Sequence, residues 1–196
     1  MHQQKGKKIF FYFFLLLIFG SINNINLSKM KFKDVDYINV TGLGEKNNTV
    51  LFQEIKNLNL SNIFFINSNE IINKIDSNSL VEEYTIFKKY PSSINVNIEK
   101  TNFLAKINKK GKIFLVGSNG KLIKKDSSYK KLPFIFGNPD IKEFLNFKKI
   151  IDQSKISYNE IKNLYFFPSN RWDLELKNNI IIKLSKNDIK ESLELA

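Results

Sequence analysis

The hydrophobic pattern begins with one long uncharged stretch. Residues 9–27 carry no charge and are continuously apolar through 9–19, after a short tail that contains three lysines. This pattern is typical of a retained membrane anchor or a cleaved secretory signal. The nearest cleavage site, Gly20-Ser21-Ile22, is a poor one, and a spanning helix needs about 20 residues. We expect a transmembrane anchor at residues 9–27 behind a cytoplasmic tail at 1–8, with a cleaved signal as the alternative.

The next segment alternates short strands and helices. Val35–Val40 and Val81–Lys88 are predicted strands, and Ile94–Ile98 alternates at a strict period of two. Between the first two strands, apolar residues at helical spacing predict two helices. Thr49 is the expected N-cap of the first helix, and Asn67 opens the second. The predicted order is β-α-α-β-β, over residues 33–101.

Residues 102–196 are richer in predicted strands. Asn119-Gly120 lies between apolar runs and indicates a hairpin. Pro133 marks the start or edge of a strand, and a helix is expected over Asp140–Ser154. Asn187 or Asp188 is expected to cap a last helix. The other predicted strands are Leu104–Asn108, Lys112–Val116, Lys121–Ile123, Ile161–Phe167, Trp172–Leu176 and Ile180–Leu184. The sequence therefore predicts an α+β protein whose second part holds an antiparallel sheet with helices.

Composition excludes most enzyme chemistry. The chain has 196 residues, no cysteine and one histidine, which is His2 in the leading tail. Thiol nucleophiles, histidine triads and Cys/His metal sites are therefore excluded from the folded part. Glu82 and Glu83 are neighbours on a predicted strand and point to opposite faces, so they form no acid/base pair. We expect no catalytic, metal or cofactor-binding residue and no small-molecule substrate.

The positive charge does not indicate nucleic-acid binding. The formal net charge is +12, from 31 Lys and Arg against 19 Asp and Glu. Arg171 is the only arginine, whereas nucleic-acid sites usually rely on arginine for bidentate contacts. The lysines are scattered through every segment. Solvated surface lysine is therefore the favoured interpretation.

The layout resembles the FtsQ/DivIB family of bacterial cell-division proteins. The residues that carry this resemblance are Ile38–Gly42, Lys89–Val96 with Glu99, Leu132-Pro133 with Gly137, and Arg171–Leu174 running through Asn178-Asn179 to Leu184. The resemblance implies a cytoplasmic tail, one membrane span, a POTRA domain and a β-domain. Two departures stand out: no proline follows Glu99 closely, and Asn178-Asn179 replaces the usual Asn-Gly or Asp-Gly.

The resemblance also implies a function and partners. It suggests a non-enzymatic division scaffold in the bacterial inner membrane, with its body in the periplasm at the septum. The implied partners are FtsB- and FtsL-type coiled-coil proteins and, through them, septal peptidoglycan synthases. The family usually continues into a further strand after the last helix, and we expect that strand to be missing before Ala196. A POTRA-containing transport or secretion component of the envelope is the alternative function.

A strand edge is the expected partner site. In β-augmentation a partner strand pairs with the unpaired backbone of such an edge. Ile180–Leu184 is apolar except for Lys183, and Arg171 and Trp172 are expected to flank it, one hairpin away. A buried Trp172 with Arg171 paired to a carboxylate is the alternative for that pair. The predicted contacts are Arg171, Trp172, Ile180, Ile181, Ile182, Lys183 and Leu184; the alternative edge is Tyr84, Thr85, Ile86, Phe87 and Lys88.

Overall fold

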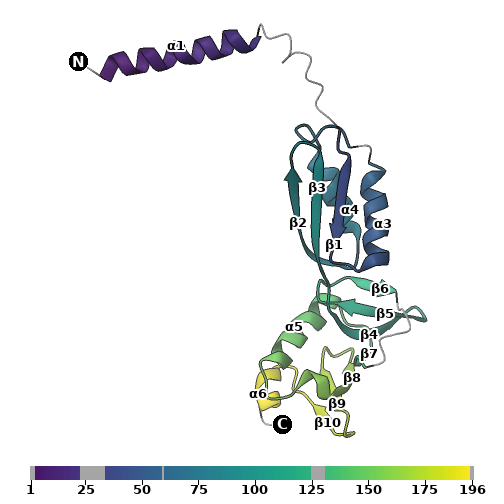
Figure 1. Cartoon of the computed structure of the whole chain (residues 1–196). Helices are drawn as coiled ribbons and strands as arrows, with labels where there is room; N and C mark the ends of the chain where they lie inside the picture. The colour runs from purple at the N-terminus through teal and green to yellow at the C-terminus, as the bar shows by residue number, and fades with distance from the viewer. Residues whose placement is uncertain (1–2, 23–33, 59, 125–130, 195–196) are drawn as a thin grey trace.

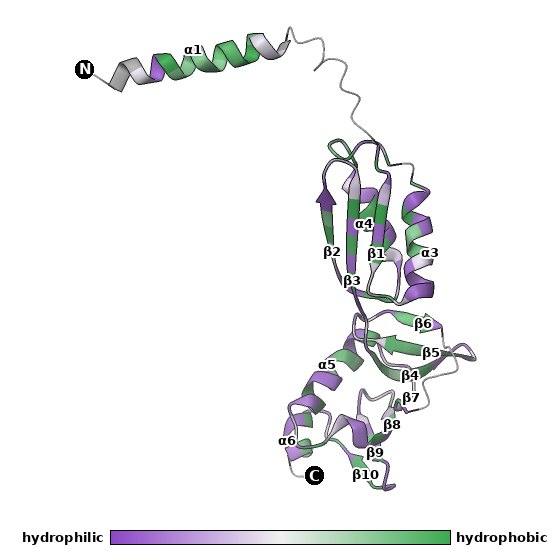
Figure 2. Cartoon of the chain, viewed as in Figure 1, coloured by the Kyte–Doolittle hydropathy of each residue, from purple (hydrophilic) through white to green (hydrophobic). Residues whose placement is uncertain are grey.

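The computed structural model describes residues 3–22, 34–58, 60–124 and 131–194 (Figure 1). Helix α1 (Gln3–Ile22) is hydrophobic over most of its length, and its large apolar side chains are exposed (Figure 2). No helix in the described part of the chain is both long enough and apolar enough to cross a membrane. Residues 23–27 of the predicted anchor lie outside the described residues.

A three-stranded sheet with two helices follows. Its elements are β1 (Tyr37–Thr41), α3 (Glu45–Lys56), α4 (Ser68–Ser77), β2 (Val81–Lys89) and β3 (Ser93–Lys100). The strand order is β1-β3-β2, with β1 parallel and β2 antiparallel to β3. Alternate residues of β3, namely Ile94, Val96 and Ile98, join Leu51 and Ile75 of the helices in one buried cluster. The predicted β-α-α-β-β order is confirmed for this amino-terminal unit.

The first helix begins earlier than predicted. Thr49 lies inside α3, where its hydroxyl donates to the Glu45 carbonyl oxygen at 2.9 Å, so its prediction as the N-cap was wrong. Gly44 holds the cap position with a φ of 87°. The Asn48 side chain accepts from the Leu43 amide at 2.9 Å and so fixes the chain entering the helix. The Asn67 cap of α4 is confirmed, because its side chain accepts from the Asn69 amide.

The carboxy-terminal unit is built on a seven-stranded sheet. Its strands are β4 (Phe103–Lys109), β5 (Lys112–Gly117), β6 (Leu122–Lys124), β7 (Phe134–Phe136), β8 (Ile161–Phe166), β9 (Trp172–Leu176) and β10 (Ile181–Lys183). The order is β10-β9-β8-β7-β4-β5-β6. The α+β class is confirmed, but the predicted antiparallel sheet is mixed. β7 pairs parallel with both β4 and β8, because the chain crosses over before and after β7 instead of turning back in a hairpin.

Helices cover one face of this sheet. Asp140 caps α5 (Ile141–Asp152), as its side chain accepts from the Lys142 amide at 2.9 Å. Phe144, Phe147 and Ile151 of α5 are buried in the second hydrophobic cluster, which also takes Leu193 from α6 (Ile189–Glu194). A short 3-10 turn, η1 (Tyr158–Glu160), precedes β8. Pro133 marks the start of β7, which lies inside the sheet and not at its edge.

The β5–β6 turn of the carboxy-terminal unit forms hydrogen bonds to the amino-terminal unit. The Asn119 side-chain amide donates to the carbonyl oxygens of Ser79 and Val81, at 3.0 and 2.8 Å. The Lys121 ammonium donates to the Asp76 carbonyl oxygen, just before the end of α4, at 2.6 Å. The Ser118 hydroxyl donates to the Glu82 carboxylate at 2.6 Å. These bonds hold the start of β2 against the second sheet, so the two units are coupled by specific polar contacts.

Candidate partner-binding edge

Both predicted edges lie at the edge of a sheet. β10 is the outermost strand beside β9, and no described strand pairs with its other side. β2 is likewise the outer strand of the three-stranded sheet beside β3. An edge strand presents a row of unpaired N–H and C=O groups that can pair with another chain. Backbone position is therefore compatible with strand addition at either site.

The hydrogen bonds between β9 and β10 show which backbone N–H and C=O groups of β10 face away from the sheet. The Leu176 amide donates to the Ile180 carbonyl oxygen at 2.9 Å, and the Leu184 amide donates to the Trp172 carbonyl oxygen at 3.3 Å. Hydrogen-bonded pairs alternate with non-bonded pairs along an antiparallel ladder. Ile182 therefore directs its backbone groups toward β9. The N–H and C=O groups of Ile181 and Lys183 face away from the sheet.

The side chains of this edge differ in exposure. Ile180 and Ile181 are 54% and 57% exposed, and Lys183 is also exposed. Ile182 packs against the core cluster, and Leu184 is buried within it. An exposed isoleucine pair beside outward backbone groups gives a partner strand both hydrogen bonds and apolar contact. We name Ile180–Leu184 the β10 edge.

Trp172 does not reach this surface. Its side chain is 2% exposed, and its ring stacks on Phe147 with a centroid separation of 4.5 Å and an interplanar angle of 16°. Phe144 and Phe166 enclose it at 6.4 and 4.8 Å. The structure thus agrees with the alternative that Trp172 is a core residue, and it supports β9 from inside.

Arg171 is paired within its own unit. Its guanidinium bonds the Asp173 carboxylate at 3.1 and 3.2 Å and lies over the Phe167 ring at 4.5 Å. Asp173 is only 4% exposed, so the arginine compensates a buried negative charge. Part of the guanidinium stays accessible, since the Arg171 side chain is 41% exposed.

An aromatic row that the sequence analysis missed consists of Phe134 and Phe136 of β7 and Tyr165 of β8, and it is separated from β10 by β9. On the sheet face opposite the helices, Phe136 lies opposite Tyr165 in register, and their rings stack at 5.0 Å. Tyr165 lies opposite Asp173, which in turn lies opposite Lys183 of β10. Phe136 remains 44% exposed. The alternation Phe-Ile-Phe in β7 could have indicated that Phe134 and Phe136 share the face away from the buried Ile135.

A polar network stabilises the centre of this face. The Glu175 carboxylate accepts hydrogen bonds from the Asn163 amide, the Lys162 ammonium and the Tyr165 hydroxyl, at 2.8, 2.8 and 2.6 Å. These donors lower the pKa of Glu175 from 4.5 to about 2, because each favours the ionised form. The bond to Glu175 raises the pKa of the Tyr165 phenol. Such coupled groups hold β8 and β9 in register beside β10.

The alternative edge carries more charge. In β2, Tyr84 and Ile86 pack toward the helices, whereas Thr85, Phe87 and Lys88 are exposed. Burial, followed by the negative charge of Asp76, raises the pKa of Tyr84. The register with β3 shifts between Val81 and Glu83. Bulges and charged side chains are features by which proteins protect an edge from unwanted pairing.

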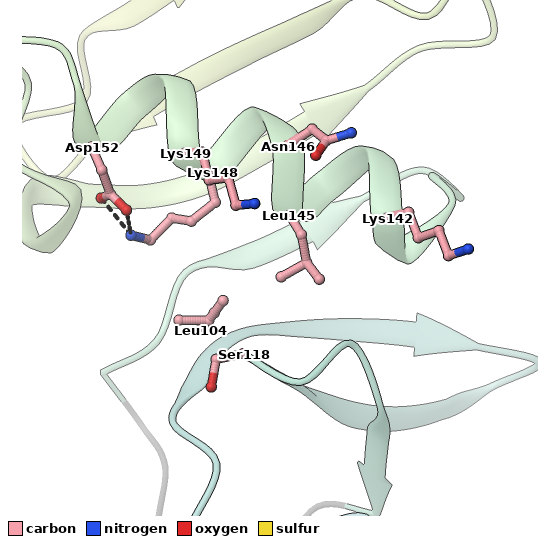
Figure 3. A pocket seen from close by; sticks show the side chains of 8 residues that line it. All are labelled: Leu104, Ser118, Lys142, Leu145, Asn146, Lys148, Lys149 and Asp152. Carbon is pink, nitrogen blue, oxygen red and sulfur yellow. Dashed lines mark hydrogen bonds and ion pairs between the residues drawn. The ribbon is translucent and has the colours of Figure 1, made fainter. Parts of the chain in front are cut away.

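A groove of the carboxy-terminal unit is shown in Figure 3. It has a volume of about 450 Å³ between α5 and the end of β5, and three lysines line it. Lys148 is paired with Asp152, and the Ser118 hydroxyl is bonded to Glu82. Among the described residues, no group of three or more His, Cys, Asp or Glu side chains is placed to hold a metal ion.

Sequence comparison matches two family models to most of the chain. The model described as "POTRA domain, FtsQ-type" matches residues 33–100, and "Cell division protein FtsQ/DivIB, C-terminal" matches residues 105–196. The first match covers the amino-terminal unit with its two helices. The second covers almost the whole seven-stranded sheet and both of its helices.

The sequence identity to two individual relatives is below 30%. The chain is 29% identical over 121 residues to cell division protein DivIB of Clostridium tetani, which is 61% of this chain and 45% of that protein. It is 20% identical over 137 residues to cell division protein FtsQ of Bradyrhizobium diazoefficiens, which is 69% of this chain and 40% of that protein. The matched region therefore spans less than half the length of these relatives.

One solved structure is also similar. It is the major extracytoplasmic domain of the cell division protein DivIB from Geobacillus stearothermophilus, with a TM-score of 0.37 and 10% identity. The match covers 48% of this chain and 87% of the chain in that structure. The family assignment rests on the two sequence models and the curated relatives. On these matches, the chain belongs to the FtsQ/DivIB family of bacterial cell-division proteins.

Proposed function

We propose that this protein is a non-enzymatic scaffold of the division machinery, which recruits other division proteins by strand addition at the β10 edge. The observation that carries the proposal is the exposed pair Ile180 and Ile181 beside the outward backbone groups of Ile181 and Lys183. Burying these side chains against a partner strand would add apolar contact to the main-chain hydrogen bonds. The match to the FtsQ/DivIB C-terminal model supports division over the alternative of envelope transport.

The β10 edge is a better acceptor than the β2 edge. The β10 edge has two exposed isoleucines and one lysine. β2 carries Glu82, Glu83, Lys88 and Lys89 along nine residues, and its register is interrupted. Natural edges are protected from pairing by such charges and irregularities. A partner would therefore lose less solvation of charged groups at β10.

The remaining assignments complete this proposal. Residues 9–27 anchor the chain in the bacterial inner membrane, with residues 1–8 in the cytoplasm and the body in the periplasm at the septum. The POTRA domain spans residues 33–101, and the β-domain spans 102–196. The partners are coiled-coil division proteins of the FtsB and FtsL type, which connect the scaffold to septal peptidoglycan synthases. Support comes from the uncharged sequence of 9–27, the exposed apolar surface of α1 and the family assignment.

Protease accessibility and fluorescence microscopy test the proposal together. Protease added to spheroplasts should digest the body and leave a small protected N-terminal fragment that resists carbonate extraction. A fluorescent fusion should collect at the septum and restore division after depletion of the native protein. A full-length chain that carbonate removes from membranes would contradict the anchor. A fusion that restores envelope transport but not division would contradict the division role.

A further inference from the structure

Five exposed aromatic side chains gather at one end of the amino-terminal unit. They are Tyr37, Phe64, Phe65, Phe87 and Tyr90, and their exposed fractions range from 52% to 76%. Isolated exposed apolar residues are ordinary, whereas a contiguous group marks an interaction surface. None of the five lies at the β10 edge or in the aromatic row. We name these five residues the aromatic tip.

One ring contact and one backbone hydrogen bond connect Phe64, Tyr90 and Tyr37 through the β2–β3 turn. The rings of Phe64 and Tyr90 are in contact at 4.9 Å, which joins the α3–α4 loop to the β2–β3 turn. The Tyr37 amide donates to the Ser92 carbonyl oxygen of that turn at 3.3 Å. Phe87 lies two residues before the end of β2, opposite Asn95. β1 therefore begins, and β2 ends, at the end of the unit that carries the tip (Figure 1).

The tip is also the place where the chain enters this unit. Asp34 pairs with Asn62, two residues before Phe64. Eleven residues lie between Ile22, the last residue of α1, and Asp34, and a chain of that length reaches at most about 40 Å. If α1 lies in a bilayer, this short connection keeps the tip close to the bilayer surface at a high effective concentration.

The chemistry of the tip fits the membrane–water interface. Tyrosine carries an apolar ring with a polar hydroxyl, and aromatic residues are enriched at the level of lipid headgroups. Lys88 and Lys89 lie at the end of β2 beside the tip and can approach anionic headgroups, whereas Asp34 and Asp36 oppose that attraction. The aromatic side chains therefore dominate, and anionic lipid should contribute only a modest part of the affinity.

We propose that the aromatic tip inserts into the lipid interface of the membrane that holds α1, and so fixes the orientation of the body on that membrane. This inference rests on the proposed anchor at residues 9–27. The occupant is a phospholipid bilayer surface. A docked tip would place the β10 edge, which belongs to the far unit, away from the bilayer and accessible to partners.

Site-specific fluorescence in the full-length chain tests this inference. The protein has no cysteine, so single labels can be placed by substitution. Lys89→Cys reports on the tip, Lys177→Cys in the β9–β10 turn is the matched exposed-lysine control, and Leu17→Cys reports on α1. Each variant, carrying an environment-sensitive dye, is reconstituted into phosphatidylcholine–phosphatidylglycerol vesicles with or without nitroxide-bearing lipids. The nitroxide is shallow for Lys89→Cys and Lys177→Cys and lies deep in the acyl chains for Leu17→Cys, because residue 17 is near the middle of the proposed span.

We expect lipid quenching at Lys89→Cys to exceed that at Lys177→Cys by about twofold or more. Adding Phe64→Ser, Phe65→Ser and Tyr90→Ser should remove most of that excess. These side chains are exposed, so circular dichroism should show the fold unchanged. Equal quenching at Lys89→Cys and Lys177→Cys, or quenching that survives the three substitutions, would overturn the inference.

The label at Leu17→Cys distinguishes a failure of tip insertion from a failure of the proposed membrane anchor. Quenching at Leu17→Cys without excess quenching at Lys89→Cys keeps the anchor and rejects tip insertion. No quenching at Leu17→Cys rejects the anchor, whatever the tip does. A blue-shifted dye at Lys89→Cys that lipid does not quench indicates a protein contact at the tip and also rejects lipid insertion.

Discussion

Ile182 lies opposite Leu174 in the register between β10 and β9. The hydrogen bonds from the amides of Leu176 and Leu184, on either side of this pair, show that its backbone groups are used inside the sheet. The next residue, Lys183, has its backbone groups on the outer side. One position along the strand thus separates a residue whose backbone groups bond β9 from a residue whose backbone groups point away from the sheet.

A proline scan of β10 uses this difference. Lys183→Pro removes an outward amide and leaves the bonds to β9, so it should abolish partner recruitment while changing stability little. Ile182→Pro removes an inward amide and leaves its partner carbonyl without a donor, which should cost about 1–3 kcal/mol of unfolding free energy. Co-purification of division proteins measures recruitment, and urea unfolding followed by circular dichroism measures stability. A stable Lys183→Pro variant that still recruits partners would place the binding edge elsewhere.

The Asn119 contact predicts a stability cost that arises between the two units. Asn119→Ala removes both donors to the carbonyl oxygens of Ser79 and Val81. Leaving partly buried carbonyl groups without these donors should lower the unfolding free energy by about 1–3 kcal/mol. Urea unfolding of the purified body checks the value. A variant as stable as the wild type would show that these bonds do not couple the units.

Glu175 predicts a pH dependence with a definite sign. Its pKa is lowered to about 2 in the folded chain, from an ordinary value of 4.5. The ionised form is thus favoured by folding, and the associated stability is fully present above pH 4.5 and lost as the pH falls toward 2. Glu175→Gln cannot ionise and should lose stability at pH 7.

Comparison of unfolding free energies at several pH values checks this effect. The difference between the wild type and Glu175→Gln should be largest above pH 4.5 and should shrink toward pH 2. Asp140→Asn, at the exposed cap of α5, is a matched carboxylate substitution outside the network. If the difference in unfolding free energy between the wild type and Glu175→Gln stays constant across this pH range, the donors do not favour the ionised form of Glu175.

Trp172 predicts a packing effect and not a binding effect. Trp172→Ala would leave a cavity among Phe144, Phe147 and Phe166 and should cost about 3–5 kcal/mol. Trp172→Phe keeps an aromatic ring there and should cost less. Far-UV circular dichroism is the suitable measurement, since Trp172 is the only tryptophan. A Trp172→Phe variant of normal stability that loses partner binding would indicate a surface role.

Element order was predictable because each element carries a local signal. The period-two alternation of Ile94, Val96 and Ile98 predicts β3, and Asn67 and Asp140 occur at the caps of α4 and α5. The prediction of Thr49 as the N-cap was wrong although its spacing suits a cap. Gly44 is the N-cap of α3, and the Asn48 side chain bonds the amide of the residue before Gly44. Local pattern also gives no information on strand direction, so the two parallel neighbours of β7 were not predicted.

The candidate site was only partly predictable for a related reason. The apolar run at Ile180–Leu184 predicts a strand there, and the exposed Ile180 and Ile181 lie just before and at the start of β10. The burial of Trp172 depends on α5, whose position relative to β9 is a tertiary feature. The aromatic row joins two strands, β7 and β8, that are separated in the sequence by α5, and the tip joins a loop, a turn and strand ends. Such groupings follow from topology and not from local pattern.

Photo-crosslinking in dividing cells tests most directly whether the β10 edge binds a division partner. A benzophenone amino acid replaces Ile181 in the full-length protein, and separately replaces Phe87 at the alternative edge and Ile113 in β5 as an exposed control. We predict adducts with a small coiled-coil division protein from position 181, and none from position 113. Adducts with that protein from position 87 alone, with none from 181, would contradict binding at the β10 edge.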